Sequence, residues 1–153
     1  MKMTLSKALR YKKRVVENIR NLEQEVQQNN CKIEGEERDV DVRLCLKIRA
    51  VWVRHLVELK MALQTKTLPI MRSILEMAEL KAEIASLQHL QTNHGTVRAT
   101  YRDALNLKYE AEIRKPERDK MIKELQAKID DYQTTIDAYN AETLVELADP
   151  ELP

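Results

Sequence analysis

The stretch TLSKALRYKKRVVENIRNLEQEV, residues 4–26, decides the fold class of this chain. Thr4 is a favourable N-cap, because its side-chain oxygen can accept a hydrogen bond from a backbone N–H of the first helical turn. After it, residues recur at alternating steps of three and four, which is the spacing of a coiled-coil seam: Leu5, Ala8, Lys12, Val15, Ile19, Leu22, Val26, Asn29 and Ile33. The pattern predicts a helix over residues 4–33.

Two polar residues, Lys12 and Asn29, interrupt this seam. A polar side chain in a seam weakens the packing but can specify the register or the number of helices. The alternative is that both residues lie where the seam meets solvent. The composition agrees with long helices in either case. Ala, Glu, Lys, Leu and Arg make up about half of the 153 residues, and the chain has two glycines and no phenylalanine.

Three further segments have a helical period. We expect helices over residues 42–66, 68–93 and 117–141, with an acidic loop at 34–41. The segment 42–66 has one seam and further apolar residues on other faces, so it is predicted to be the most buried helix. Its seam residues are Val42, Cys45, Trp52, Leu56, Leu59 and Leu63, and those of the next segment are Ile70, Met77, Leu80, Ile84 and Leu87. Gly95 is a candidate left-handed residue after the helix at 68–93. Residues 144–153 are expected to form a frayed acidic tail.

An extended connector is predicted near residues 108–116. Tyr109, Ala111 and Ile113 alternate with charged residues, which is the period of a strand. The residue before a proline avoids the helical region, so Lys115 should be extended and Pro116 should begin the last helix. Residues 96–115 as a whole are ambiguous between helix and strand, because Val97, Tyr101, Ala104 and Leu105 suit a helix. Backbone groups of an extended segment need partners, and the same segment of another subunit is one source.

The charge of the chain is balanced overall but uneven along its length. The formal net charge is +1, whereas residues 1–20 contain seven cations and one carboxylate. Lys7, Arg10, Lys13 and Arg14 lie within two turns on one broad helix face. Such a patch could contact nucleic-acid phosphates or an acidic protein partner. Against nucleic acid, the chain contains no recognisable base-reading module, and a basic helix face is more often simply solvated.

A catalytic or metal site is not expected. The chain lacks a phosphate-binding glycine loop, a nucleophile motif and a zinc spacing. Glu76, Glu79 and Glu83 could form a surface stripe, but solvated charges or ion pairs explain them better than a metal. Cys31 and Cys45 are expected to be reduced thiols. We therefore predict no enzyme activity, no cofactor and no metal.

The chain also lacks the apolar run of a signal peptide or a membrane span. The expected location is the cytoplasm, or a particle assembled in the cytoplasm.

Four stretches support a resemblance to a known family: SKALRYKKRVVENIRNLEQEV at 6–26, LVELKMALQTKT at 56–67, ILEMAELKAEIASLQHL at 74–90 and IDDYQTTIDAYNAETLVEL at 129–147. Together they resemble small bacterial helical proteins often labelled septicolysin-like, whose function is uncharacterised. The resemblance spans most of the chain and lies mainly in helical pattern. It implies an extended connector that begins near EIR at 112–114. The chain departs from the family at Tyr139-Asn140-Ala141, where the family tends to have an Asn-Trp pair.

These patterns together predict a single all-α domain over residues 1–153, with four long helices in antiparallel, coiled-coil-like bundle packing. The predicted function is non-catalytic self-assembly as a structural or scaffold protein, including a subunit of a larger particle such as a phage virion. The expected subunit contacts are Trp52, Leu56, Tyr109, Ala111 and Ile113. The alternative is a binding module that uses the basic first helix. The family label suggests a cytolysin, but no amphipathic hairpin or apolar insertion loop is present in the sequence.

Overall fold

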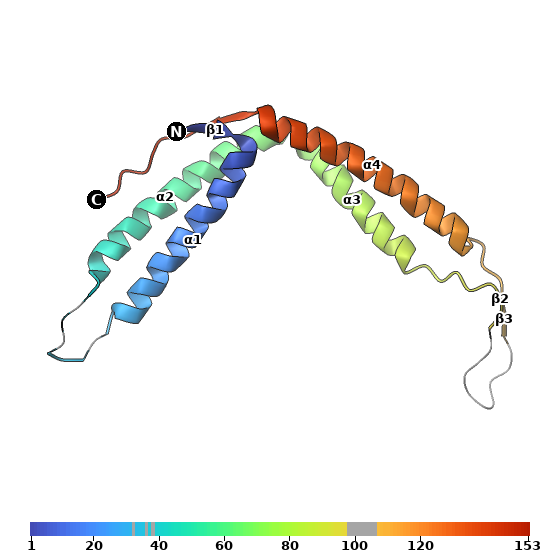
Figure 1. The fold of residues 1–153 in the computed structure, drawn as a ribbon, viewed down its shortest axis with the longest axis horizontal. Helices are drawn as coiled ribbons and strands as arrows, with labels where there is room; N and C mark the ends of the chain where they lie inside the picture. Colours follow the sequence, from blue (N-terminus) through green and yellow to red (C-terminus); the bar gives the residue numbers. More distant parts are fainter. Residues whose placement is uncertain (32, 36, 38, 98–106) are drawn as a thin grey trace. The chain divides into compact units, whose positions relative to one another are not determined.

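The computed structural model describes residues 1–31, 33–35, 37, 39–97 and 107–153. It is 72% helical, with four helices and short strands, which confirms the all-α fold class with short extended segments (Figure 1). The sequence suggested one domain, but the chain divides into two compact units. Unit 1 comprises Met1–Ile70 and Asp137–Pro153, and unit 2 comprises Met71–Ile136. Each unit is described by itself.

Two helices form most of unit 1. Helix α1 (Leu5–Asn29) follows the predicted N-cap Thr4, whose Oγ1 accepts a hydrogen bond from the Lys7 N–H at 3.4 Å. It ends four residues earlier than the predicted boundary at residue 33. The apolar seam loses its packing there, since the side chain of Ile33 is 70% exposed. Helix α2 (Val42–Thr67) begins after Asp41, whose carboxylate accepts the Leu44 N–H.

The seams of α1 and α2 meet in a small core. Its buried members are Leu5, Ala8, Val15, Leu59, Leu63 and Val145. Five of the six are seam residues of the two helices, so the heptad pattern identified the packed faces correctly. Among the described residues, α2 has four buried side chains, whereas α1 and α4 have three each and α3 has none. This order agrees with the prediction that the segment 42–66 is the most buried helix.

A short sheet closes one end of this core. Strand β1 (Lys2–Thr4) pairs antiparallel with β4 (Leu144–Glu146), and Met3 lies opposite Val145. The expected fraying of residues 144–153 is therefore wrong for β4. The strand pair satisfies backbone hydrogen bonds, and the Val145 side chain is 1% exposed against the core. The acidic composition of the tail did not reveal this single apolar anchor.

The end of α4 is also attached to unit 1. Helix α4 (Lys115–Glu142) contributes residues to both units. In unit 1 the Tyr139 hydroxyl donates a 2.9 Å hydrogen bond to the backbone carbonyl of Lys66, near the end of α2. The predicted helix over 68–93 begins differently from the expectation: Leu68–Ile70 form a 3₁₀ turn, η1, and α3 (Met71–Gln88) ends five residues early. Pro69 lies in this turn, where its missing N–H costs little.

The predicted connector is partly a hairpin. Strand β2 (Gly95–Val97) pairs antiparallel with β3 (Leu107–Tyr109) of the same chain. Gly95 has the predicted left-handed conformation, with φ +86°, but it begins β2 and does not cap a helix, because α3 ends at Gln88. Beyond β3, the Ala111 N–H donates to His94 Nδ1 at 3.3 Å. These partners come from within the chain, so a second subunit is not required for them.

The connector ends at α4, and here one detail of the prediction is wrong. Lys115 is the first helical residue rather than an extended one. The Arg118 N–H donates to the Arg114 carbonyl at 3.0 Å and closes the first turn around Pro116. A proline is tolerated in the first turn, because the N–H it lacks would have no partner within the helix. The ambiguous residues 98–106 lie outside the described part of the chain.

Candidate interaction surfaces

The predicted basic patch is a real surface of α1. Lys7, Arg10, Lys13 and Arg14 are all exposed. Their spacing places them on the side of the helix away from the buried residues Leu5, Ala8 and Val15. No carboxylate of the described residues forms an ion pair with any of the four. The structure thus brings these four predicted residues together on one face.

A second basic surface lies on α2. This helix contains six cations and one carboxylate, Glu58, which gives a net charge of +5. Five of the cations are exposed: Arg43, Lys47, Arg54, Lys60 and Lys66. The sixth, Arg49, forms an ion pair with Glu23 of α1 at 3.2 Å. The basic first twenty residues were apparent in the sequence, whereas this second basic surface was not predicted.

An apolar stripe runs between the exposed cations of α2. We call Leu46, Val53, Val57 and Met61 the α2 stripe. Steps of seven, four and four residues place them on one helix face. Their exposed fractions are 47%, 36%, 52% and 58%. The sequence pattern showed apolar residues on several faces of this segment, but it could not show which face would remain uncovered.

Trp52 and Leu56 were predicted to contact another subunit. In the structure both are half-buried and pack against the core of unit 1. Their side chains belong to the seam that α1 covers, so the exposed α2 stripe is the better candidate for an outside contact on this helix. Of the other predicted contacts, Tyr109 is 41% exposed in β3, while Ala111 and Ile113 are half-buried. A role for the connector in subunit contacts stays a prediction.

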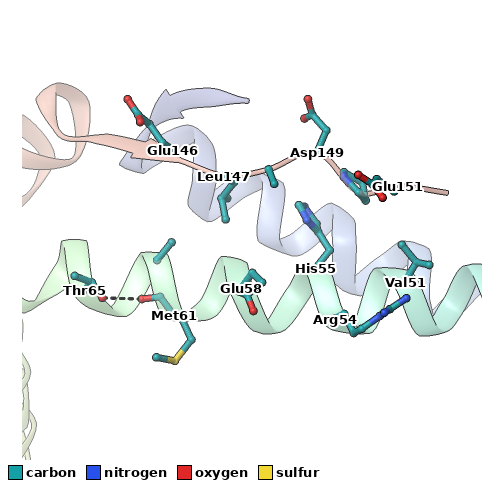
Figure 2. A pocket seen from close by; sticks show the side chains of 13 residues that line it. Val51, Arg54, His55, Glu58, Met61, Thr65, Glu146, Leu147, Asp149 and Glu151 are labelled. Carbon is teal, nitrogen blue, oxygen red and sulfur yellow. Dashed lines mark hydrogen bonds between the residues drawn. The ribbon is translucent and has the colours of Figure 1, made fainter.

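One buried polar cluster links α1, α2 and the segment after β4. The His55 side chain is 7% exposed, and its Nε2 lies 3.0 Å from the Tyr11 hydroxyl. The rings of Tyr11 and Trp52 meet the His55 imidazole edge-on, with centroids 5.7 Å and 5.8 Å away. Figure 2 shows His55 projecting from α2 toward the segment that contains Asp149.

Burial determines the ionisation of this cluster. It lowers the pKa of His55, and the nearby Asp149 carboxylate and N-terminal ammonium act in opposite directions on the same group. Burial also raises the pKa of Tyr11, and Asp149 adds to that effect. Neutral imidazole and neutral phenol are therefore the favoured forms at neutral pH, and the hydrogen bond between them satisfies the Tyr11 hydroxyl and Nε2 of His55.

A cavity of about 620 Å³ lies beside this cluster, between α2 and residues 146–151. Arg54, Glu58 and Met61 line it from α2, and Glu146 and Asp149 line it from the other side (Figure 2). Glu146 and Asp149 on the second side of the cavity both form ion pairs. Glu146 forms an ion pair with Lys2 at 2.6 Å, which lowers its pKa. No arrangement of nucleophile, base and oxyanion donor is present among these side chains.

Unit 2 has an incomplete core. Helix α4 buries Leu125, Ile129 and Ile136, whereas α3 buries none of its side chains. Yet α3 has apolar residues at the predicted seam spacing, and all of them are only half-buried: Met77, Leu80, Ile84 and Leu87. The packing between α3 and α4 is looser than that between α1 and α2. An apolar seam in which no side chain is fully buried is an unusual surface for a small unit.

A groove of about 540 Å³ borders this seam. Leu75 and Leu80 line it from α3 and Tyr132 lines it from α4, and Leu75 is 58% exposed. At its edge the Tyr132 hydroxyl donates a 2.6 Å hydrogen bond to Glu76, which also accepts from Arg72 at 2.8 Å. These two bonds, that from Tyr132 first, lower the pKa of Glu76, and the same contact raises the pKa of Tyr132.

Residues with possible metal chemistry do not converge. Across the described residues, no three His, Cys, Asp or Glu side chains are grouped to hold a metal ion. Glu76 accepts hydrogen bonds from Tyr132 and Arg72 and is not grouped with other carboxylates. Cys31 and Cys45 are both free thiols. None of the described helices combines the length and the hydropathy needed to cross a bilayer.

No family model, curated protein or solved structure matches the chain. The septicolysin-like resemblance therefore remains a similarity of helical pattern. Function is inferred below from the surfaces of this chain alone.

Proposed function

We propose that this protein is a non-catalytic structural protein that self-associates through unit 2. The observation that supports the proposal is the half-covered seam of α3, which has no buried side chain although its apolar residues have heptad spacing. Full burial of a Leu, Ile or Met side chain contributes about 1.5–3 kcal/mol. Covering the part of each seam residue that is still exposed would therefore add at most roughly 1 kcal/mol per residue.

A second copy of unit 2 is a suitable cover. The α3 helix has two cations and three carboxylates, and residues 115–136 of α4 have five of each. Two such surfaces can pack without strong repulsion. A two-fold interface presents the same patch from both subunits, and two helical hairpins that share their seams would form a four-helix core.

Self-association of this kind suits a component of a larger assembly. A subunit of a virion or of another multi-subunit machine is a specific form of the proposal, and the corresponding location is the cytoplasm or a particle assembled there. Recovering the protein from its source with its neighbours attached would identify that assembly.

Light scattering over a concentration series tests the proposal. The full chain should form a discrete oligomer at micromolar concentration. Leu80→Glu should shift the mass toward the monomer, because Leu80 belongs to the seam and also lines the groove, so a charge there opposes burial by a second copy. Val16→Glu is the matched control, since Val16 is 47% exposed on α1 and should leave the mass unchanged. A stable monomer of the unmodified chain would rule the proposal out.

A second candidate function is a binding module that uses the basic face of α1. The observation in its favour is that Lys7, Arg10, Lys13 and Arg14 are exposed together and lack ion-pair partners among the described residues. Nucleic acid and an acidic protein are both open as partners. Filter binding of a DNA duplex in a salt series tests the first, because phosphate contacts require affinity to fall steeply with salt. Absent or salt-independent binding would eliminate nucleic acid.

A further inference from the structure

We infer that the α2 stripe and the cations beside it form a docking surface for an acidic amphipathic helix of another protein. The inference concerns unit 1 and does not rest on self-association through unit 2. It starts from an exposed apolar surface with a definite shape. Leu46, Val53, Val57 and Met61 follow one face of α2 over four turns. At 1.5 Å per residue the stripe is about 22 Å long, which matches a partner helix of about 15 residues.

The stripe has the pattern of a helix-docking site. Apolar anchors at i, i+7, i+11 and i+15 are the complement of a helix that presents its own seam. The least exposed of the four, Val53, is still 36% exposed, and the most exposed, Met61, is 58% exposed. Thioether and branched aliphatic side chains adapt to a partner surface without needing polar contacts.

The flanking charges indicate the chemistry of the partner. Helical spacing places Arg43, Lys47 and Arg54 along one side of the stripe and Lys60 along the other. All four are exposed, and Glu58 is the one carboxylate of α2. A partner helix with glutamates or aspartates beside its apolar seam would place opposite charges on both sides of the contact. Such complementarity accelerates association and excludes basic partners.

The same charges argue against a second copy of α2. Each α2 has a net charge of +5, so two stripes packed together would bring cations against cations along both edges. Unit 2, whose charges are balanced, does not have this difficulty.

A lipid surface fits the stripe less well than a helix does. Helices that lie at a membrane interface usually present Trp, Phe or Leu. Here Trp52 packs into the core of unit 1, and two of the four stripe residues are valines. The acidic helix is therefore the occupant that agrees with both the apolar stripe and the cations.

Fluorescence anisotropy with designed peptides tests the inference on the full chain. The probe is a labelled peptide with leucine at positions a and d and glutamate at e and g of its heptads. One control peptide has lysine in place of glutamate, and another has serine in place of leucine. The acidic leucine peptide should bind at least about tenfold more tightly than either control, a difference of about 1.4 kcal/mol.

Variants then locate the contact. Val57→Glu and Arg54→Glu should each weaken binding about tenfold or more, because one charges the stripe and the other reverses a flank. Val16→Glu and Arg20→Glu on α1 make the same chemical changes elsewhere and should leave the affinity within about twofold. Arg54→Glu should also improve binding of the lysine peptide.

Four results would overturn the inference. They are equal binding of the serine peptide, unchanged binding by the Val57 and Arg54 variants, a change of oligomer mass in Val57→Glu, and stripe-dependent binding to phosphatidylserine vesicles in place of the peptide. Leu80→Glu separates this inference from the proposed function. That variant should lose self-association and still bind the acidic peptide with the affinity of the unmodified chain.

Discussion

The Tyr11 hydroxyl lies 3.0 Å from Nε2 of His55, and this bond joins α1 to α2 beneath the segment that follows β4. The bond pairs two polar groups that burial would otherwise leave unsatisfied. The pKa of His55 also depends on other groups at this end of unit 1, since the Asp149 carboxylate and the N-terminal ammonium both act on the imidazole.

The first prediction concerns the titration of His55. NMR should give a pKa below the ordinary 6.5, because burial disfavours the imidazolium. Asp149→Asn should lower the pKa further, since the carboxylate opposes the effect of burial. Tyr11→Phe controls for the hydrogen bond without removing a charge. A higher pKa in Asp149→Asn would show that the carboxylate does not act on His55.

The same shift predicts how stability depends on pH. Because the folded pKa is lower than the unfolded one, the unfolded chain binds more protons below pH 6.5. The stabilisation from neutral His55 should therefore be complete above pH 6.5 and be lost as the pH falls toward the folded pKa. Urea unfolding on both sides of pH 6.5 measures this loss, and His55→Gln should remove this part of the pH dependence.

The core of unit 1 provides the next prediction. Leu59 is fully buried, so Leu59→Ala should lower the free energy of unfolding by about 2–5 kcal/mol through lost transfer energy and a cavity. Leu68→Ala is the matched control. Leu68 is 68% exposed, and its truncation should change the free energy by less than about 0.5 kcal/mol. Equal effects in urea unfolding would contradict the described packing.

Strand β4 is predicted to contribute to stability through one face only. Val145 is 1% exposed and its neighbour Leu144 is 45% exposed. Val145→Ala removes about two buried methylene equivalents and should cost about 1–2 kcal/mol, whereas Leu144→Ala should cost less than about 0.5 kcal/mol. Hydrogen exchange at the Leu5 and Leu147 amides should accelerate in Val145→Ala, because both donate across the β1–β4 closure. No difference between the two variants would refute the burial pattern.

The contact between Glu76 and Tyr132 predicts a second pH effect, in unit 2. Since the folded pKa of Glu76 is lower than the ordinary 4.5, its stabilisation is present above pH 4.5 and is lost as the pH falls through the folded value. Tyr132→Phe should raise the Glu76 pKa more than Arg72→Gln does, because the tyrosine bond is the larger cause. Carboxyl-carbon NMR measures both. The reverse order would mean that the arginine dominates.

The helical part of the fold could be predicted because it depends on local periodicity. The seam of residues 5–26 and the seam of α2 are visible in the sequence, and both face the core of unit 1. Thr4 also acts as the N-cap that its residue type suggests. These features depend on neighbours within a few residues, which is the range that a sequence pattern reports.

The candidate surfaces were less predictable, because they depend on which faces remain uncovered. The basic face of α1 was apparent from one helix alone. The α2 stripe was visible only as a surplus of apolar positions, and Trp52 and Leu56 looked equally suitable as outside contacts. The Tyr11–His55 bond had no sequence signal, since it requires the register of one helix against another. Val145 was hidden in an acidic tail, where its long-range partner β1 could not be inferred.

The closure of β1 by β4 has a consequence for synthesis on the ribosome. The Met1 and Leu147 groups that bond across it are 146 positions apart, and unit 2 is inserted between the two parts of unit 1. At about 5–20 residues per second, translating Met71–Ile136 takes roughly 3–13 s. Throughout that interval the hairpin of α1 and α2 has emerged without Val145 over Leu5. The core of unit 1 in the nascent chain therefore stays incomplete, exposed to solvent or bound by a chaperone, until β4 has been synthesised.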